Sequence, residues 1–273
     1  MTTKKFIDAG SSGEWGWHAT ELALRCPRLF AYTYRTGQKR EETSSPPLLK
    51  GSLVHQGLAH HYRRKQEVQQ GGDPETWATP EDAIDDCATK LGAHAPQYAA
   101  LAKDTVARYA MHWANERLEV MAVEEVFGSE IGGWRYTQRL DLVVREADGK
   151  VWIYDHKTTG RITRDVATRY TLSGQFIGMH NFGSRVYGDD FGGVKLNMIE
   201  VGDNGIGGFK RQMPDPAPGA IRSFPLTVLH ARERVAELDR SGIPPEAWPQ
   251  TLSEQTCVTA YGTCQFFEKC RWS

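Results

Sequence analysis

The stretch QRLDLVVREADGKVWIYDHKTT, residues 138–159, decides the fold of this chain. Two runs rich in β-branched and aromatic residues flank Ala147-Asp148-Gly149, which is the pattern of a β-hairpin with a tight turn. A turn that is symmetric about Asp148 pairs Asp141 with Asp155. The hairpin is therefore predicted to place two carboxylates opposite each other.

Opposed carboxylates need compensation, which a divalent metal ion supplies. Directly opposed side chains have Cβ atoms about 4.5–5.5 Å apart, and like charges at that distance destabilise the pair. Lys157 lies two positions after Asp155, so it projects from the same face of the strand. Carboxylate oxygens suit Mg²⁺ or Mn²⁺, and an ammonium group stabilises charge on a phosphate under hydrolysis. The alternative is a surface hairpin with solvated charges, and a one-residue slip in register would destroy the opposition.

The two halves of this hairpin, RLDLVV and VWIYDHKT, resemble motifs two and three of the PD-(D/E)XK nuclease superfamily in its RecB-like branch. The resemblance implies that Asp141 and Asp155 bind metal and that Lys157 is catalytic. The backbone carbonyl of His156 is a further implied ligand. The implied fold class is α/β, with a central mixed sheet flanked by helices as in restriction endonucleases.

Two features before the hairpin extend the resemblance. Gly51-Ser52-Leu53-Val54-His55 resembles the helical G-x-x-x-H motif of that branch, which implies that His55 is a metal ligand and that the enzyme is an exonuclease. His60 and His61 are the competing candidates. Glu124 or Glu125 matches an acidic residue on the preceding strand, and strand alternation leaves open which of the two points inward.

Gln175, after the hairpin, resembles the glutamine of a Q-x-x-x-Y motif in the same branch. The resemblance implies a contact to DNA. Met179 stands where the tyrosine is expected, and a plain glutamine on a helix surface is the alternative.

Four cysteines are spaced in a way that indicates a second metal centre. Cys26 is followed by Pro27, whereas Cys257, Cys264 and Cys270 lie in the last seventeen residues. The pattern resembles the iron–sulfur variant of the branch, found in CRISPR-adaptation and phage exonucleases, which implies a structural 4Fe-4S cluster that clips the C-terminal tail to the first helix. The gap from Cys257 to Cys264 is longer than in the family, so a zinc site and four uninvolved thiols stay open.

Apolar spacing and turn residues predict the remaining elements and the organisation of the chain. Helices are expected at 20–34 with a break at Pro27, and at 49–68, 80–91, 97–119, 165–187 and 224–239. Strands are expected at 120–131, 134–145, 151–157, 194–201 and 206–213. We predict an N-terminal helical region at 1–119 with Cys26 and His55, a PD-(D/E)XK nuclease core at 120–240, and a cysteine-rich tail at 241–273 that packs on the N-terminal region.

The charge balance gives no sign of a polyanion partner, because 33 Lys plus Arg stand against 34 Asp plus Glu. A DNA surface must therefore come from local clusters. The basic candidates are Arg25, Arg28, Arg35, Arg63, Arg64, Lys65, Arg161, Arg164 and Arg169. Residues 1–17 contain no continuous apolar stretch, which argues against a secretory signal or membrane span and predicts a cytoplasmic protein.

These observations predict a metal-dependent DNA nuclease that uses Mg²⁺ or Mn²⁺, an exonuclease acting on DNA ends with single strands favoured. The alternative is a non-catalytic DNA-binding or assembly subunit of a recombination, repair, phage replication or CRISPR-adaptation complex. The set of His55, Asp141, Asp155 and Lys157 argues against that alternative, because a protein with no use for metal gains nothing from opposing two carboxylates. A small-molecule metalloenzyme is disfavoured, because the sequence shows no phosphate-binding glycine loop.

Overall fold

A computed structural model of the protein describes residues 4–7, 13–37, 45–163, 165–202, 205–259 and 262–272. The chain divides into two compact units, each assembled from separate stretches. The sheet unit comprises Met1–Ser11, Ser44–Val126 and Arg139–Ile221, and the cysteine unit comprises Ser12–Thr43, Phe127–Gln138 and Arg222–Ser273. The predicted division into 1–119, 120–240 and 241–273 uses consecutive stretches of the chain, and it stays a prediction.

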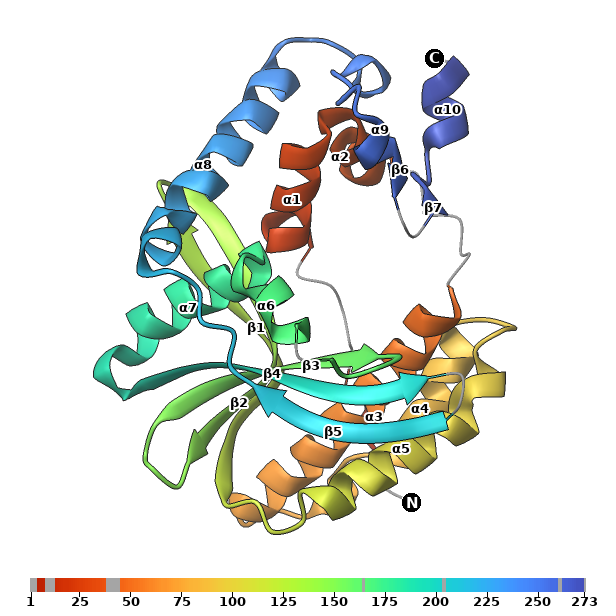
Figure 1. Ribbon diagram of the computed structural model, residues 1–273, viewed down its shortest axis with the longest axis vertical. Helices are drawn as coiled ribbons and strands as arrows, with labels where there is room; N and C mark the ends of the chain where they lie inside the picture. The colour runs from red at the N-terminus through yellow and green to blue at the C-terminus, as the bar shows by residue number, and fades with distance from the viewer. Residues whose placement is uncertain are drawn as a thin grey trace. The chain divides into compact units, whose positions relative to one another are not determined.

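A five-stranded sheet in the order β1-β2-β3-β4-β5 forms the centre of the fold (Figure 1). Its strands are β1 (Leu118–Ile131), β2 (Trp134–Glu146), β3 (Val151–Thr159), β4 (Phe191–Gly202) and β5 (Gly205–Gln212). The β2–β3 and β4–β5 pairs are antiparallel and the β3–β4 pair is parallel. The predicted mixed sheet is therefore confirmed, with a helical crossover between its parallel strands.

Three helices before the sheet cover one of its faces, two of them in contact with strands and the third packed on those two. They are α3 (Pro46–Gln69), α4 (Pro80–Lys90) and α5 (Ala99–His112). The start of α4 follows its sequence signals, because the Thr79 hydroxyl accepts the Asp82 N–H at 3.1 Å and Pro80 opens the helix. These helices share a core with the sheet that includes Leu58, Tyr109 and Tyr154.

The helices that join β3 to β4 lie on the opposite face. They are α6 (Val166–Thr171) and α7 (Gly174–Tyr187), and α7 packs on β3 and β4. Because strand side chains alternate, Tyr154 points to the α3 side, whereas Asp155 points to the α7 side. Helices thus flank the sheet as predicted, and β3 carries the reactive groups at its centre.

Two predicted helices differ from the structure in extent. The helix expected to reach Glu119 ends at His112, and β1 begins at Leu118, because Leu118 and Val120 turn alternately into the core. The single helix expected at 165–187 is interrupted at Ser173, whose backbone is extended. The interruption restarts the chain as α7 and brings Gln175 into the first turn of that helix.

The cysteine unit has its own small core. Its elements are α1 (Trp17–Arg25), α2 (Pro27–Tyr34), α8 (Pro218–Arg240, mostly in this unit), α9 (Glu254–Cys257), α10 (Phe267–Trp272), and the strand pair β6 (Val258–Thr259) and β7 (Gly262–Thr263). Cys26 separates α1 from α2 with an extended backbone, as expected for the residue before Pro27. Across the described residues, none of the helices combines the length and apolar character that a membrane crossing requires.

Candidate active site

The β2–β3 hairpin carries the first two acidic groups. Its pairing runs from Leu142 with Tyr154 to Arg145 with Val151, which is the predicted register and, continued by one pair, brings Asp141 opposite Asp155. One carboxylate oxygen of Asp141 accepts the backbone N–H of His156 at 2.8 Å. The buried Asp141 carboxylate is thereby fixed against β3.

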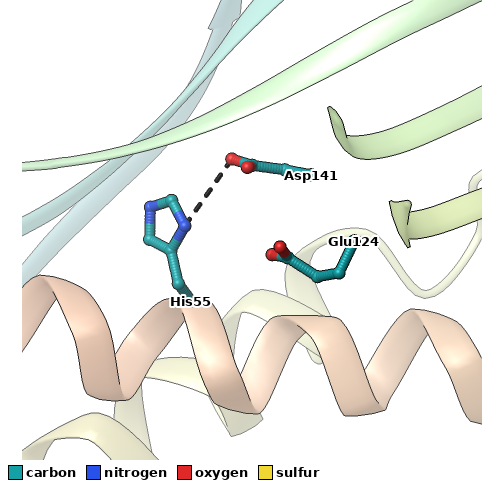
Figure 2. Close-up of side chains that lie close together, drawn as sticks. All are labelled: His55, Glu124 and Asp141. Atoms are coloured by element: carbon teal, nitrogen blue, oxygen red, sulfur yellow. Dashed lines mark ion pairs between the residues drawn. The ribbon is translucent and has the colours of Figure 1, made fainter. Parts of the chain in front are cut away.

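His55 approaches the same place from the middle of α3. Its Nδ1 lies 3.6 Å from Asp141 Oδ2, and the side chain is about a quarter exposed, at 26%. Figure 2 shows His55, Glu124 and Asp141 pointing toward one another from α3, β1 and β2. Burial, reinforced by Lys157 and Arg139, lowers the pKa of His55. A neutral imidazole is the form that binds metal ions.

Two glycines of α3 explain how the helix comes this close. At Gly51, one turn before His55, an added Cβ would lie 2.9 Å from the Thr158 hydroxyl of β3. At Gly57 an added Cβ would lie 2.8 Å from Ile84 and 2.8 Å from Val106, on α4 and α5. The absence of side chains at these positions therefore lets the helix pack closely on both its neighbours.

Glu124, and not Glu125, is the acidic residue of β1 that faces the site. Glu124 has a φ of 50°, in the left-handed region, and the regular alternation of buried residues in β1 ends there. A residue in this conformation acts as a bulge and redirects a side chain. The Glu124 side chain is 2% exposed and its Oε2 lies 3.0 Å from Arg139 Nε, whereas Glu125 is exposed.

The side chains of His55, Glu124 and Asp141 each place one possible ligand atom, a nitrogen or a carboxylate oxygen, within 4.8 Å of the other two. Burial and repulsion from Asp141 raise the pKa of Glu124 to about 8. Burial opposes ionisation of Asp141, yet His55, His156 and Lys157 outweigh it and hold the pKa of Asp141 below its ordinary value. Such a set of acidic and imidazole groups fits a divalent cation, which removes the repulsion between the carboxylates.

Asp155, Lys157 and Gln175 form a second group beside the first. Lys157 Nζ lies 2.6 Å from Asp155 Oδ2, and Gln175 Nε2 donates to Asp155 Oδ1 at 2.9 Å. Lys157 Nζ also donates to Gln175 Oε1 at 3.5 Å. Burial and repulsion from Asp141 raise the pKa of Asp155 to about 6. Asp155 raises the pKa of Lys157 against the effect of burial, so the lysine is an ammonium ion.

The competing histidines, His60 and His61, make packing or hydrogen-bond contacts outside the candidate metal site. His60 is fully buried, accepts the Ile7 N–H at 3.1 Å on Nε2, and has Nδ1 3.1 Å from the Ala78 carbonyl oxygen. His61 packs edge-on against Tyr62. Neither belongs to the three-residue group around Asp141, so His55 is the histidine that the structure brings to the carboxylates.

Most of the predicted basic residues are engaged in contacts within the protein. Arg63 donates to Val123, Arg64 to Pro74 and Trp77, and Lys65 pairs with Glu116. Within the cysteine unit, Arg28 donates to Trp248, and Arg35 pairs with Glu14 and Asp239. Arg25, Arg161 and Arg169 are exposed, and Arg164 lies outside the described residues.

The four cysteines of the predicted cluster line one pocket in the cysteine unit. Cys26, Cys257, Cys264 and Cys270 share this lining with Leu29, Phe266 and Phe267, among others. The Cys264 N–H donates to the Cys257 carbonyl at 2.7 Å across the short β-ribbon. In the described part of the chain, no three of these sulfurs lie within 4.8 Å of one another. The structure therefore shows a shared pocket, with the thiols more widely spaced than around a single metal ion.

Two further residues near the site were not predicted from the sequence. Asn197 and Arg211 lie behind the site, where Asn197 Nδ2 is 2.7 Å from His156 Nδ1 and Arg211 Nε donates to Asn197 Oδ1 at 3.4 Å. Neither belongs to a local motif. Only their alignment across β3, β4 and β5 gives them a place near the site.

Comparison with known proteins supplies a family match. A model described as the PD-(D/E)XK nuclease superfamily matches residues 17–176, a range that contains His55, Glu124, Asp141, Asp155 and Lys157. Comparison with curated protein sequences gives no match.

One solved structure shares the fold at low sequence identity. A protein of Eubacterium rectale named "Putative exonuclease" has a TM-score of 0.53 and 11% identity, and the match covers 98% of this chain and 94% of that one. A protein named SSO0001 matches at a TM-score of 0.31 and 16% identity, over 84% of this chain and 89% of that chain.

Proposed function

The chain belongs to the PD-(D/E)XK nuclease superfamily, and on that premise we propose that it is a metal-dependent deoxyribonuclease that hydrolyses DNA from an end. The observation that carries the proposal is the convergence of His55, Glu124 and Asp141 within 4.8 Å, with the Asp155–Lys157 pair beside them. Nucleases of this superfamily use divalent metal ions, and this group fits one.

We assign the metal ligands to His55, Glu124, Asp141, Asp155 and the backbone carbonyl of His156. When Mg²⁺ or Mn²⁺ is bound there, it supplies polarisation of the phosphate and a lowered pKa of a coordinated water. Burial of Asp141 and Asp155 keeps bulk water from competing for their oxygens. A bound ion would favour the ionised form of Glu124, whose pKa is raised to about 8, whereas Asp155 is already paired as a carboxylate with Lys157.

Lys157 is the proposed catalytic residue. Its ammonium group is held by Asp155 and by Gln175, so its position is fixed before a substrate arrives. An ammonium at that position orients the attacking water and stabilises negative charge on the phosphate as it builds. Gln175 then serves first to hold Asp155 and Lys157, and the DNA contact implied for it is an additional role for the same side chain.

The preference for ends and for single-stranded DNA belongs to the proposal. The preference for ends is supported by the G-x-x-x-H spacing of Gly51 and His55 and by the name of the Eubacterium rectale protein that shares the fold. Protein partners are proposed in recombination, repair or phage replication complexes, and the cytoplasm is the proposed location.

We propose that the pocket of Cys26, Cys257, Cys264 and Cys270 holds a structural 4Fe-4S cluster, with zinc as the alternative. The support is that one pocket collects thiols from α1–α2 and from the C-terminal elements. Iron content and visible absorbance of protein purified without air test the assignment. A colourless protein that contains zinc contradicts it.

The activity is tested with end-labelled single- and double-stranded DNA, linear and circular, with Mg²⁺ or Mn²⁺. Wild type is expected to degrade linear single strands and leave circles intact, and Asp155→Ala and Lys157→Ala are expected to be inactive. Glu125→Ala is a matched control with an exposed carboxylate next to Glu124. If wild type and both variants are equally inert on all substrates, the protein is a DNA-binding subunit and the catalytic proposal fails.

A further inference from the structure

A row of three polar residues crosses the sheet behind the candidate active site. His156 on β3 pairs with Asn197 on β4, and Asn197 pairs with Arg211 on β5. Paired residues share a face of the sheet, and His156 points away from Asp155 and Lys157. His156 and Asn197 are 1% and 0% exposed, so this row is buried beneath α3 and α5.

The hydrogen bonds of the row fix the orientation of each group. An arginine can only donate, so the Asn197 atom facing Arg211 Nε at 3.4 Å is the carbonyl oxygen. The amide nitrogen of Asn197 then donates to Tyr109 Oη at 2.8 Å and to His156 Nδ1 at 2.7 Å. His156 must accept on Nδ1 and carry its proton on Nε2. Every donor and acceptor of the Asn197 amide thus has an assigned partner.

Arg211 connects the row to the helices. Its Nη2 donates to Tyr62 Oη at 3.2 Å, to Tyr109 Oη at 3.0 Å and to Glu116 at 2.7 Å. Tyr62 donates its one hydroxyl proton to Glu116 at 3.2 Å. In the 2.8 Å hydrogen bond between the two tyrosine hydroxyls, Tyr109 is therefore the donor. Tyr62 lies two helical turns after His55 on α3 and its ring stacks on the His156 ring at 6.0 Å.

The row therefore touches both sides of the candidate metal site. His156 donates its backbone N–H to Asp141, and its carbonyl is a proposed metal ligand. Tyr62 anchors the helix that carries His55. Groups that hold metal ligands in place are worth about 10–100-fold in metal affinity when removed.

Resting on the function proposed above, we propose that Asn197, Arg211 and Tyr109, whose hydroxyl accepts from both of the others, are positioning residues of the metal site. They fix the peptide of His156, and through it the Asp141 carboxylate, while Arg211 and the tyrosines Tyr62 and Tyr109 hold α3 at a set distance from β3. None of the three is assigned a contact to the substrate or the ion.

The test measures Mn²⁺ binding by calorimetry on the full chain. Asn197→Leu removes both donors to His156 and Tyr109, and Tyr109→Phe removes one hydroxyl with little change in volume. Both are expected to bind Mn²⁺ about 10–100-fold more weakly. Thr105→Val is the control, since Thr105 is a fully buried α5 residue whose hydroxyl donates to Leu101 and not to the row.

The outcomes separate positioning from general stability. If Tyr109→Phe and Thr105→Val melt alike but only Tyr109→Phe loses Mn²⁺ affinity, the inference holds, even where Asn197→Leu does not fold. If wild type binds Mn²⁺ and cuts DNA, while folded row variants bind Mn²⁺ like wild type, this inference fails and the proposed function stands. A wild type that binds no Mn²⁺ overturns the proposed function itself. Independently of metal, the ¹⁵N spectrum is expected to show His156 protonated on Nε2. A proton on Nδ1 would contradict the hydrogen bond from Asn197 to His156 and overturn the inference.

Discussion

The two candidate metal centres are built in opposite ways. In the sheet unit the ligands stand on α3, β1, β2 and β3, and each is held by a neighbour, as Asp141 is held by His156. In the cysteine unit the thiols lie around a pocket. Cys26 stands between α1 and α2, Cys257 and Cys270 lie on helices of four and six residues, and Cys264 follows β7. Sites on a packed core are organised before a ligand binds, whereas sites on short elements gain order from the ligand.

The largest expected effect tests the sheet unit. Removing divalent metal with EDTA is expected to lower the rate of DNA cleavage on the order of 10³-fold or more. The melting temperature is expected to fall only by the modest amount that loss of a bound ligand causes by mass action, because the core holds the ligand groups in place without the ion. A dye-based melting curve beside the cleavage assay measures both. A large drop in melting temperature on metal removal would show that this site, like the cysteine pocket, depends on its ligand for order.

The second prediction tests the cysteine unit. Cys264→Ser is expected to lower the free energy of unfolding by about 4 kcal/mol, since loss of a structural metal belongs to the most destabilising class of changes. Limited proteolysis is expected to cut first within residues 241–272. Cys87→Ser is the control, because Cys87 lies on α4 away from the pocket. Equal iron content and equal proteolysis in both variants would contradict the claim that the cysteine unit gains its order from a bound metal centre.

The third prediction uses the neighbouring acids of β1. Glu124→Gln is expected to weaken Mn²⁺ binding about 10–100-fold, and Glu125→Gln is expected to have no effect, since only the first side chain faces His55 and Asp141. Calorimetric titration of the two variants gives the answer. Equal affinities would mean that Glu124 is not a ligand.

The smallest effect concerns pH. With a pKa of about 8, Glu124 carries a proton below that pH, so Mn²⁺ affinity is expected to fall up to about tenfold per pH unit from pH 8 to pH 7. In the metal-free protein the folded state binds this proton more tightly than the unfolded state, so Glu124 lowers stability as pH rises from about 4.5 to about 8. Unfolding curves of wild type and Glu124→Gln across this pH range isolate the contribution of Glu124 to the free energy of unfolding. A constant difference between them contradicts the raised pKa.

Sequence analysis predicted well wherever the deciding interactions are local. The register of Asp141 against Asp155 follows from a turn a few residues long, and the break before Pro27 follows from proline geometry. The interruption at Ser173 also had a local signal, the Ser173-Gly174 dipeptide, which the helical spacing around it obscured.

The unpredicted features depend on contacts between distant segments. Alternation could not choose between Glu124 and Glu125, because the left-handed Glu124 breaks the alternation itself. Asn197 and Arg211 meet His156 only through the pairing of three strands. Arg63 and Arg64 were candidates for a DNA surface in the sequence, yet backbone carbonyls of Val123 and Pro74 accept from them. The units likewise join stretches that chain order separates.

The backbone at Glu124 sets a limit on how this protein can be stabilised. A non-glycine residue in the left-handed region costs on the order of 1 kcal/mol or more, and the carboxylate there adds a repulsion with Asp141. Replacement of Glu124 by Gly or Asn would reduce the backbone strain and remove the repulsion with Asp141. Selection for thermal tolerance alone would therefore favour a sturdier protein that has lost a metal ligand, so stability and activity are opposed at this one position.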